Sequence, residues 1–259
     1  MSRPEVRILH LYDQYLNIYA DRGNIQVLRT RCAWRDIDCV VDGLAPGETF
    51  ASTDYDLIYV GGGQDRDQRM IAERMVADCS ESIRDAVAHG SALLAVCGGY
   101  QLLGRGYLDA DGYDQPGVGL FGAQTIAGDD RLIGNVEIEV TLPSIGTVMD
   151  ERVVRIAGFE NHAGRTMLDD DAVPLGRVIR GCGNDGVSGF EGCQLERAVG
   201  TYLHGPLLPR NPELADWLIA AALHHRYGDA SAEHIARPVP DGVDAFAHQA
   251  MDALRLRPQ

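Results

Sequence analysis

An uninterrupted apolar run, Ala92-Leu93-Leu94-Ala95-Val96, is the feature that most constrains how this chain can fold. A strand that is apolar at every position has to be covered on both faces, as in the middle of a parallel sheet. Strands and helices are predicted to alternate before it, the strands at 6–12, 37–41 and 55–60 and the helices at 24–35 and 65–89. This alternation predicts an α/β fold with a doubly wound parallel sheet.

The second half of the sequence has a different pattern. Short strand-like runs at 134–142, 153–159, 178–180 and 198–203 alternate with glycine-rich turns. Two helices follow, at 212–226 and 243–256, and the second is amphipathic. We therefore predict one domain over residues 1–228 and a C-terminal appendage over residues 229–259.

Composition restricts the partners and the chemistry. The net charge of −15 argues against direct nucleic-acid binding, which needs a surplus of basic residues. All 23 basic residues are arginine, so a phosphate loop with its lysine is impossible and any ATP chemistry must come from another chain. The sequence contains neither a signal peptide nor the run of roughly 18–20 apolar residues that spans a membrane. We expect a cytoplasmic protein without membrane insertion.

Cys97 stands apart from the other five cysteines. None of the six forms a CxxC pair, and their spacings fit no common zinc site, so no metal site is predicted. Cys97, however, follows the central strand directly and precedes Gly98-Gly99, a pattern typical of a strand–turn–helix that exposes a nucleophile. The amide groups at such a helix start stabilise a thiolate and can hold an oxyanion. The pattern predicts a catalytic cysteine.

Three motifs together resemble one enzyme family. These are C-x-G-x-Q at 97–101, the glycine-rich loop after Val60, and Thr201-Tyr202-Leu203-His204-Gly205-Pro206. Over residues 5–228 the chain resembles the class I glutamine amidotransferases, which implies a three-layer α/β sandwich around a mostly parallel sheet. It is most similar to their cobyric-acid-synthase-like branch and, within it, to glutaminase subunits of lipid II isoglutaminyl synthase, through the segments 61–65, 131–135, 158–162 and 164–166.

The resemblance implies a role for several residues. Cys97 would attack the side-chain amide of L-glutamine, and His204 would act as the general base. The backbone amides of Gly62, Gly63 and Gly98 would form the oxyanion hole.

Two further residues would bind the substrate. Arg131 would hold the α-carboxylate of glutamine, a task suited to a bidentate guanidinium, although it could also be an ordinary surface arginine. Gln101 would line the same pocket.

His162 is the one serious rival to His204 as the base. It belongs to the compact polar triplet Glu160-Asn161-His162, which also follows a predicted strand. We interpret this triplet as a structural or partner-facing element, because His204 fits the family motif and ends the strand-like run 199–203.

The chain departs from the family pattern at two positions. Ala95 replaces the usual glycine two residues before the nucleophile, a small change that the turn should tolerate. Pro206 stands where many members carry a carboxylate that orients the histidine. Three explanations remain open: a Cys–His dyad, another acid in this chain, or an acid from a partner subunit.

The resemblance also implies a biological reaction. Ammonia from glutamine would pass to a MurT-like subunit of the Mur-ligase family, forming a heterodimer with this chain. That partner would use ATP and Mg²⁺ to amidate the α-carboxyl of D-glutamate in lipid II, at the inner face of the membrane, while this chain itself needs no cofactor. The alternatives are a subunit that serves another synthetase, such as one amidating cobyrinate, a stand-alone cysteine hydrolase, and a non-catalytic regulator of a ligase.

Overall fold

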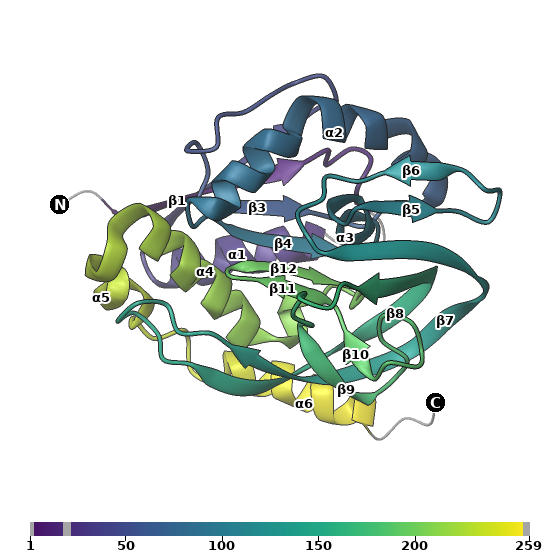
Figure 1. Ribbon diagram of the computed structural model, residues 1–259. Helices are drawn as coiled ribbons and strands as arrows, with labels where there is room; N and C mark the ends of the chain where they lie inside the picture. Colours follow the sequence, from purple (N-terminus) through teal and green to yellow (C-terminus); the bar gives the residue numbers. More distant parts are fainter. Residues whose placement is uncertain (1–2, 18–21, 256–259) are drawn as a thin grey trace.

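Two β-sheets organise the part of the chain that the computed structural model describes, residues 3–17 and 22–255 (Figure 1). The first sheet has the strand order β11-β12-β4-β3-β1-β2, and its neighbouring strands are parallel except for β11, which is antiparallel to β12. Its strands are β1 (Glu5–Leu11), β2 (Asp38–Leu44), β3 (Leu57–Val60), β4 (Ala92–Val96), β11 (Cys193–Leu195) and β12 (Ala198–Thr201).

Helices cover both faces of this sheet. Helices α1 (Arg22–Trp34) and α4 (Pro212–Tyr227) contact each other on one face, and α2 (Asp65–Ala88) and α3 (Gly98–Leu103) contact each other on the other (Figure 1). The predicted three-layer α/β sandwich around a mostly parallel sheet is confirmed. The helical pattern at 65–89 forms one continuous helix, α2.

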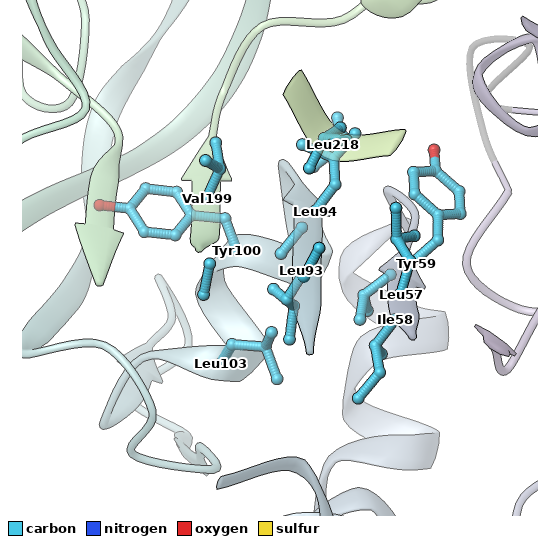
Figure 2. Close-up of a cluster of buried hydrophobic side chains, with 14 of the residues drawn as sticks. Leu57, Ile58, Tyr59, Leu93, Leu94, Tyr100, Leu103, Val199 and Leu218 are labelled. Atoms are coloured by element: carbon cyan, nitrogen blue, oxygen red, sulfur yellow. The ribbon is translucent and has the colours of Figure 1, made fainter. Parts of the chain in front are cut away.

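The apolar run at 92–96 is the central strand β4, and every one of its residues is buried. Leu94 points towards Leu218 of α4, whereas Leu93 points towards the opposite face, where Leu103 of α3 lies (Figure 2). Burial of each such leucine contributes about 1.5–3 kcal/mol, so the two helical layers are held to β4 by its alternating side chains.

The second sheet has the order β10-β9-β7-β5-β6, and β8 pairs with β7 outside this path. Its strands are β5 (Gly106–Leu108), β6 (Asp114–Pro116), β7 (Ala123–Leu142), β8 (Arg152–Leu168), β9 (Gly176–Arg180) and β10 (Phe190–Glu191). Strands β7 and β8 form a long antiparallel ribbon whose register shifts between Ala127 and Leu132. The sequence predicted only the segments 134–142 and 153–159 of this ribbon, because Gly128-Asp129-Asp130-Arg131 interrupts the apolar alternation.

The C-terminal segment packs against helices α1 and α4. It contains the short helices η2 (Gly228–Ser231) and α5 (Ala232–Ile235), followed by α6 (Val243–Arg255), while η1 (Leu208–Arg210) precedes α4. The buried Arg31 of α1 donates to Asp216 of α4 at 2.6 Å and to Asp244 of α6 at 2.7 Å, so paired charges tie α6 to the core.

The predicted final helix is thus present, with Leu256 outside the described residues. On its apolar side, Met251 is buried but Phe246 is 73% exposed. The boundary between residues 228 and 229 stays a prediction. Among the described residues, no helix combines the length and apolar character needed to cross a membrane.

Candidate active site

The turn between β4 and α3 holds Cys97 in a strained backbone conformation. Cys97 has φ 50° and ψ −107°, a positive φ that non-glycine residues rarely adopt. Its backbone N–H donates to the carbonyl of Thr201 at 2.7 Å, which anchors the turn to β12. The geometry matches the strand–turn–helix predicted for a nucleophile and places Cys97, which is 6% exposed, at the carboxyl edge of the sheet.

The two glycines after Cys97 are required by close packing. A Cβ atom at Gly98 would lie 2.6 Å from Nε2 of Gln68 and 2.9 Å from the backbone nitrogen of Gly63. A Cβ atom at Gly99 would lie 2.6 Å from the carbonyl oxygen of Val60. The glycine-rich loop after β3 therefore approaches the nucleophile turn closely, and its amides lie beside those of the turn.

His204 reaches the same edge of the sheet from β12. Strands β12 and β4 are parallel with Thr201 opposite Val96, so the residues that follow both strands lie at one edge. The backbone N–H of His204 donates to the carbonyl of Phe159 in β8 at 2.9 Å, and the N–H of Phe159 donates back at 3.2 Å.

His204 is 1% exposed. Burial, followed by the charges of His162 and Arg131, lowers the pKa of His204 to about 4. The imidazole is therefore neutral at pH 7 and able to accept a proton.

The second histidine, His162, is also buried at this site. Its Nδ1 lies 2.7 Å from the carbonyl oxygen of Gly164, which can only accept, so Nδ1 carries the proton. The ring stacks on Tyr202 with centroids 3.6 Å apart and planes 9° apart. Burial lowers the pKa of His162 to about 4.

A cavity of about 270 Å³ opens between the two sheets, a size suited to a small-molecule substrate. One wall comes from the first sheet and its helices, and the other from the second sheet. The lining residues are Gly63, Gln64, Gln68, Cys97 and Gln101 from the first, and Tyr107, Arg131, Asn161, His162, Ala163 and Gly164 from the second.

Arg131 lies in the irregular part of β7 and extends to the cavity. Its Nε donates to Oδ1 of Asn161 at 2.8 Å, and one terminal nitrogen donates to the Asn161 carbonyl at 2.8 Å. Deeper in the site, the buried Gln101 donates from Nε2 to the hydroxyl of Tyr202 at 3.1 Å. The guanidinium is thus oriented by the ribbon, while Gln101 is fixed by the strand end that leads to His204.

Known proteins with similar sequences decide the family. Residues 7–212 match the CobB/CobQ-like glutamine amidotransferase domain. The chain belongs to this family of glutamine amidotransferases. It is 38% identical over 225 residues to the lipid II isoglutaminyl synthase (glutamine-hydrolyzing) subunit GatD of Streptococcus pneumoniae, covering 86% of this chain and 83% of that protein. The corresponding subunit of Staphylococcus aureus is 36% identical, covering 86% of both chains.

More distant similarity extends to other amidotransferases. A probable cobyric acid synthase of Methanocaldococcus jannaschii is 28% identical, over 69% of this chain and 36% of that protein. Two solved structures share the fold of this amidotransferase. PurLQS from Thermotoga maritima has a TM-score of 0.53 at 15% identity, covering 85% of this chain and 95% of that chain. The glutaminase domain of Trypanosoma brucei CTPS with bound acivicin has a TM-score of 0.50 at 12% identity, covering 84% and 94%.

The amidotransferase residues predicted from sequence meet at this site. Cys97, Gly63, Gln101 and Arg131 line the cavity, and Gly62 adjoins Gly63. Gly98 packs against the same loop. His204 lies close enough to His162 and Arg131 for their charges to lower its pKa. Sequence reasoning overlooked Gln68 and Tyr107, and it interpreted His162, which lines the cavity, as a structural or partner-facing residue. Of these residues, only Gln68 could have been predicted to line the cavity, from its position in the first helical turn after the glycine-rich loop.

Many amidotransferases carry a carboxylate two residues after the histidine, where this chain has Pro206. Two nearby buried acids, Glu160 and Glu191, do not replace it. Glu160 accepts from the backbone amides of Cys182 at 2.8 Å and Gly183 at 2.9 Å. Glu191 accepts from the backbone amide of Tyr202 at 2.6 Å and the hydroxyl of Thr201 at 3.0 Å, and burial raises its pKa to about 8. Both side chains therefore bind the backbone amides of neighbouring segments and not His204.

Proposed function

We propose that this chain is the glutaminase subunit of a lipid II isoglutaminyl synthase and hydrolyses L-glutamine to glutamate and ammonia. The observation that carries the proposal is the cavity in which a strained Cys97 meets a glycine-rich loop beside a neutral, buried His204. Membership of the glutamine amidotransferases and similarity to the GatD subunits over most of both chains support the same reaction.

In the proposed reaction, His204 accepts the thiol proton while Sγ of Cys97 attacks the carboxamide carbon. The backbone amides of Gly63 and Gly98 stabilise the oxyanion. Collapse of the tetrahedral intermediate breaks the C–N bond, and the protonated His204 returns its proton to the leaving ammonia. Water, activated by neutral His204, then hydrolyses the glutamyl thioester and releases glutamate.

In this proposal, the β7–β8 ribbon binds the substrate. Arg131 has two of its nitrogens on Asn161, which turns the guanidinium towards the cavity. There it would bind the α-carboxylate of glutamine by charge-assisted hydrogen bonds.

A MurT-like partner of the Mur-ligase family would complete the system. It would bind ATP and Mg²⁺, for which this lysine-free chain has no phosphate loop, and amidate the α-carboxyl of D-glutamate in lipid II at the inner face of the membrane. Because Pro206 occupies the usual acid position and Glu160 and Glu191 are committed elsewhere, we propose that the partner also supplies a carboxylate to His204. Such a carboxylate would raise the pKa of His204 and make it a stronger base.

The test is transfer of labelled nitrogen. The chain, co-purified with a Mur-ligase-like partner, is given ATP, Mg²⁺, lipid II and glutamine labelled with ¹⁵N in its amide. The proposal expects label in the α-carboxamide of D-isoglutamine, and none when Cys97→Ser replaces the wild type. Label in a cobyrinate acceptor instead, with lipid II unchanged, would assign the chain to a different synthetase.

A further inference from the structure

The cavity holds a buried side chain, Gln68, to which the steps above give no task. Gln68 lies in the first turn of α2, is 1% exposed and lines the cavity. Its Nε2 donates to the carbonyl oxygen of Gly63 at 3.1 Å. Because a carbonyl can only accept, this bond fixes which end of the Gln68 amide is nitrogen and which is oxygen.

The oxygen end of that amide lacks a donor. Oε1 of Gln68 is buried and has no hydrogen-bond partner within the described residues. A buried acceptor without a donor is unfavourable, so the cavity is built for a ligand that brings N–H groups.

Gln68 also lies directly against the nucleophile turn. A Cβ atom at Gly98 would be 2.6 Å from Nε2 of Gln68 and 2.9 Å from the amide nitrogen of Gly63. A carboxamide held for attack by Cys97, with its oxygen on the amides of Gly63 and Gly98, would therefore lie beside the Gln68 side chain.

We propose that Oε1 of Gln68 accepts a hydrogen bond from the substrate's γ-carboxamide NH₂ and makes the site select glutamine over glutamate. This inference rests on the proposed glutaminase function. Glutamine brings the missing donor, whereas the carboxylate of glutamate brings only acceptors and is repelled by Oε1. The same repulsion favours release of the product. Gln68 is thus a specificity-determining residue, distinct in role from Gln101, which donates to Tyr202.

The test compares two substrates that differ in this donor. L-Glutamate γ-methyl ester keeps the carbonyl that Cys97 attacks but has a methoxy group in place of NH₂. We expect Gln68→Met to lower kcat/KM for glutamine by roughly tenfold to a hundredfold, and to change kcat/KM for the ester by less than about threefold. The exposed Gln26 of α1 gives the matched control, Gln26→Met, which should change neither value.

Equal losses on both substrates would overturn the inference, since Gln68 would then only order the Gly63 loop. Unchanged glutamine kinetics would also overturn it. A second readout is product inhibition: the inhibition constant of L-glutamate should fall in Gln68→Met, because the repelling oxygen is gone, and a constant that stays the same or rises contradicts the proposal. Wild-type protein that hydrolyses neither substrate would instead contradict the proposed glutaminase function itself.

Discussion

The two sheets contribute to the cavity in different ways. Strands β3 and β4 of the first sheet are buried at every position, and the turn after β4 holds Cys97 in a conformation with φ 50°. The β7–β8 ribbon of the second sheet contains buried, half-buried and exposed positions and carries Arg131, Asn161 and His162. In the proposed reaction, the close-packed sheet thus holds the reacting groups, and the more open ribbon presents groups for substrate recognition.

The two halves are joined beside the site. The backbones of His204 and Phe159 exchange two hydrogen bonds, and the rings of His162 and Tyr202 stack at 3.6 Å. His204, the proposed base, is therefore held by both halves, although it follows a strand of the first. Chemistry and recognition can therefore be tested separately, by substitutions in the first sheet or in the ribbon.

The largest effect is expected at the base. His204→Asn removes the proton acceptor and should lower kcat/KM for glutamine by about 10³-fold. The measurement is ammonia release from the chain with its partner. His89→Asn, at an exposed histidine that ends α2, is the control and should leave the rate unchanged. A near-normal rate for His204→Asn would move the base to the ribbon, where His162 is the candidate.

The packing difference between the halves predicts a stability effect. A methyl group at Gly99 would lie 2.6 Å from the backbone oxygen of Val60, so Gly99→Ala should lower the free energy of unfolding by about 2–3 kcal/mol. On the ribbon, the nearest atom to a methyl group at Gly134 is Oε1 of Glu160 at 3.9 Å, so Gly134→Ala should be nearly neutral. Urea denaturation measures both. Equal losses would show that the ribbon is packed as tightly as the sheet.

If the ribbon recognises the substrate, a substitution of Arg131 should weaken glutamine binding. Arg131→Gln should raise KM for glutamine by about tenfold and change kcat by less than about threefold, because one carboxylate contact is lost in both ground and transition states. Arg29→Gln, at an exposed position of α1, is the control. A fall in kcat as large as the rise in KM would contradict the division of labour, since Arg131 would then act on the reacting groups.

The smallest effect is the expected response to pH. Burial, with the charges of His162 and Arg131, lowers the pKa of His204 to about 4, and the base must be neutral to accept a proton. Activity of the chain alone should therefore change by less than about twofold between pH 7.5 and 5.5 and fall only as pH drops through about 4. An ordinary histidine would lose roughly tenfold by pH 5.5. If the partner supplies a carboxylate, the falling limb should move to higher pH in the complex.

The sequence predicted the first sheet and the turn that carries Cys97 because both are encoded locally. The apolar run of β4 and the glycines after Cys97 need no distant residue to be recognised. The length of the ribbon and the pairing of Arg131 with Asn161, 30 residues away, depend on cross-strand register, which short apolar runs broken by glycine and aspartate do not reveal.

The sequence did not reveal how the buried polar groups are used. Gln68 looks like any glutamine on an amphipathic helix until the loop beside Gly98 is folded against it. The sequence does not place His162 in the cavity either, because its stacking on Tyr202 joins residues 40 positions apart in the chain (202 − 162). Tertiary contacts, not composition, place both in the cavity.

Ammonia release from glutamine tests the central claim most directly, with wild type and Cys97→Ser each measured alone and with a co-expressed Mur-ligase-like partner. The account predicts release by the wild type that increases with the partner and disappears in Cys97→Ser. Release that persists in Cys97→Ser, or no release by folded wild type under either condition, would contradict it.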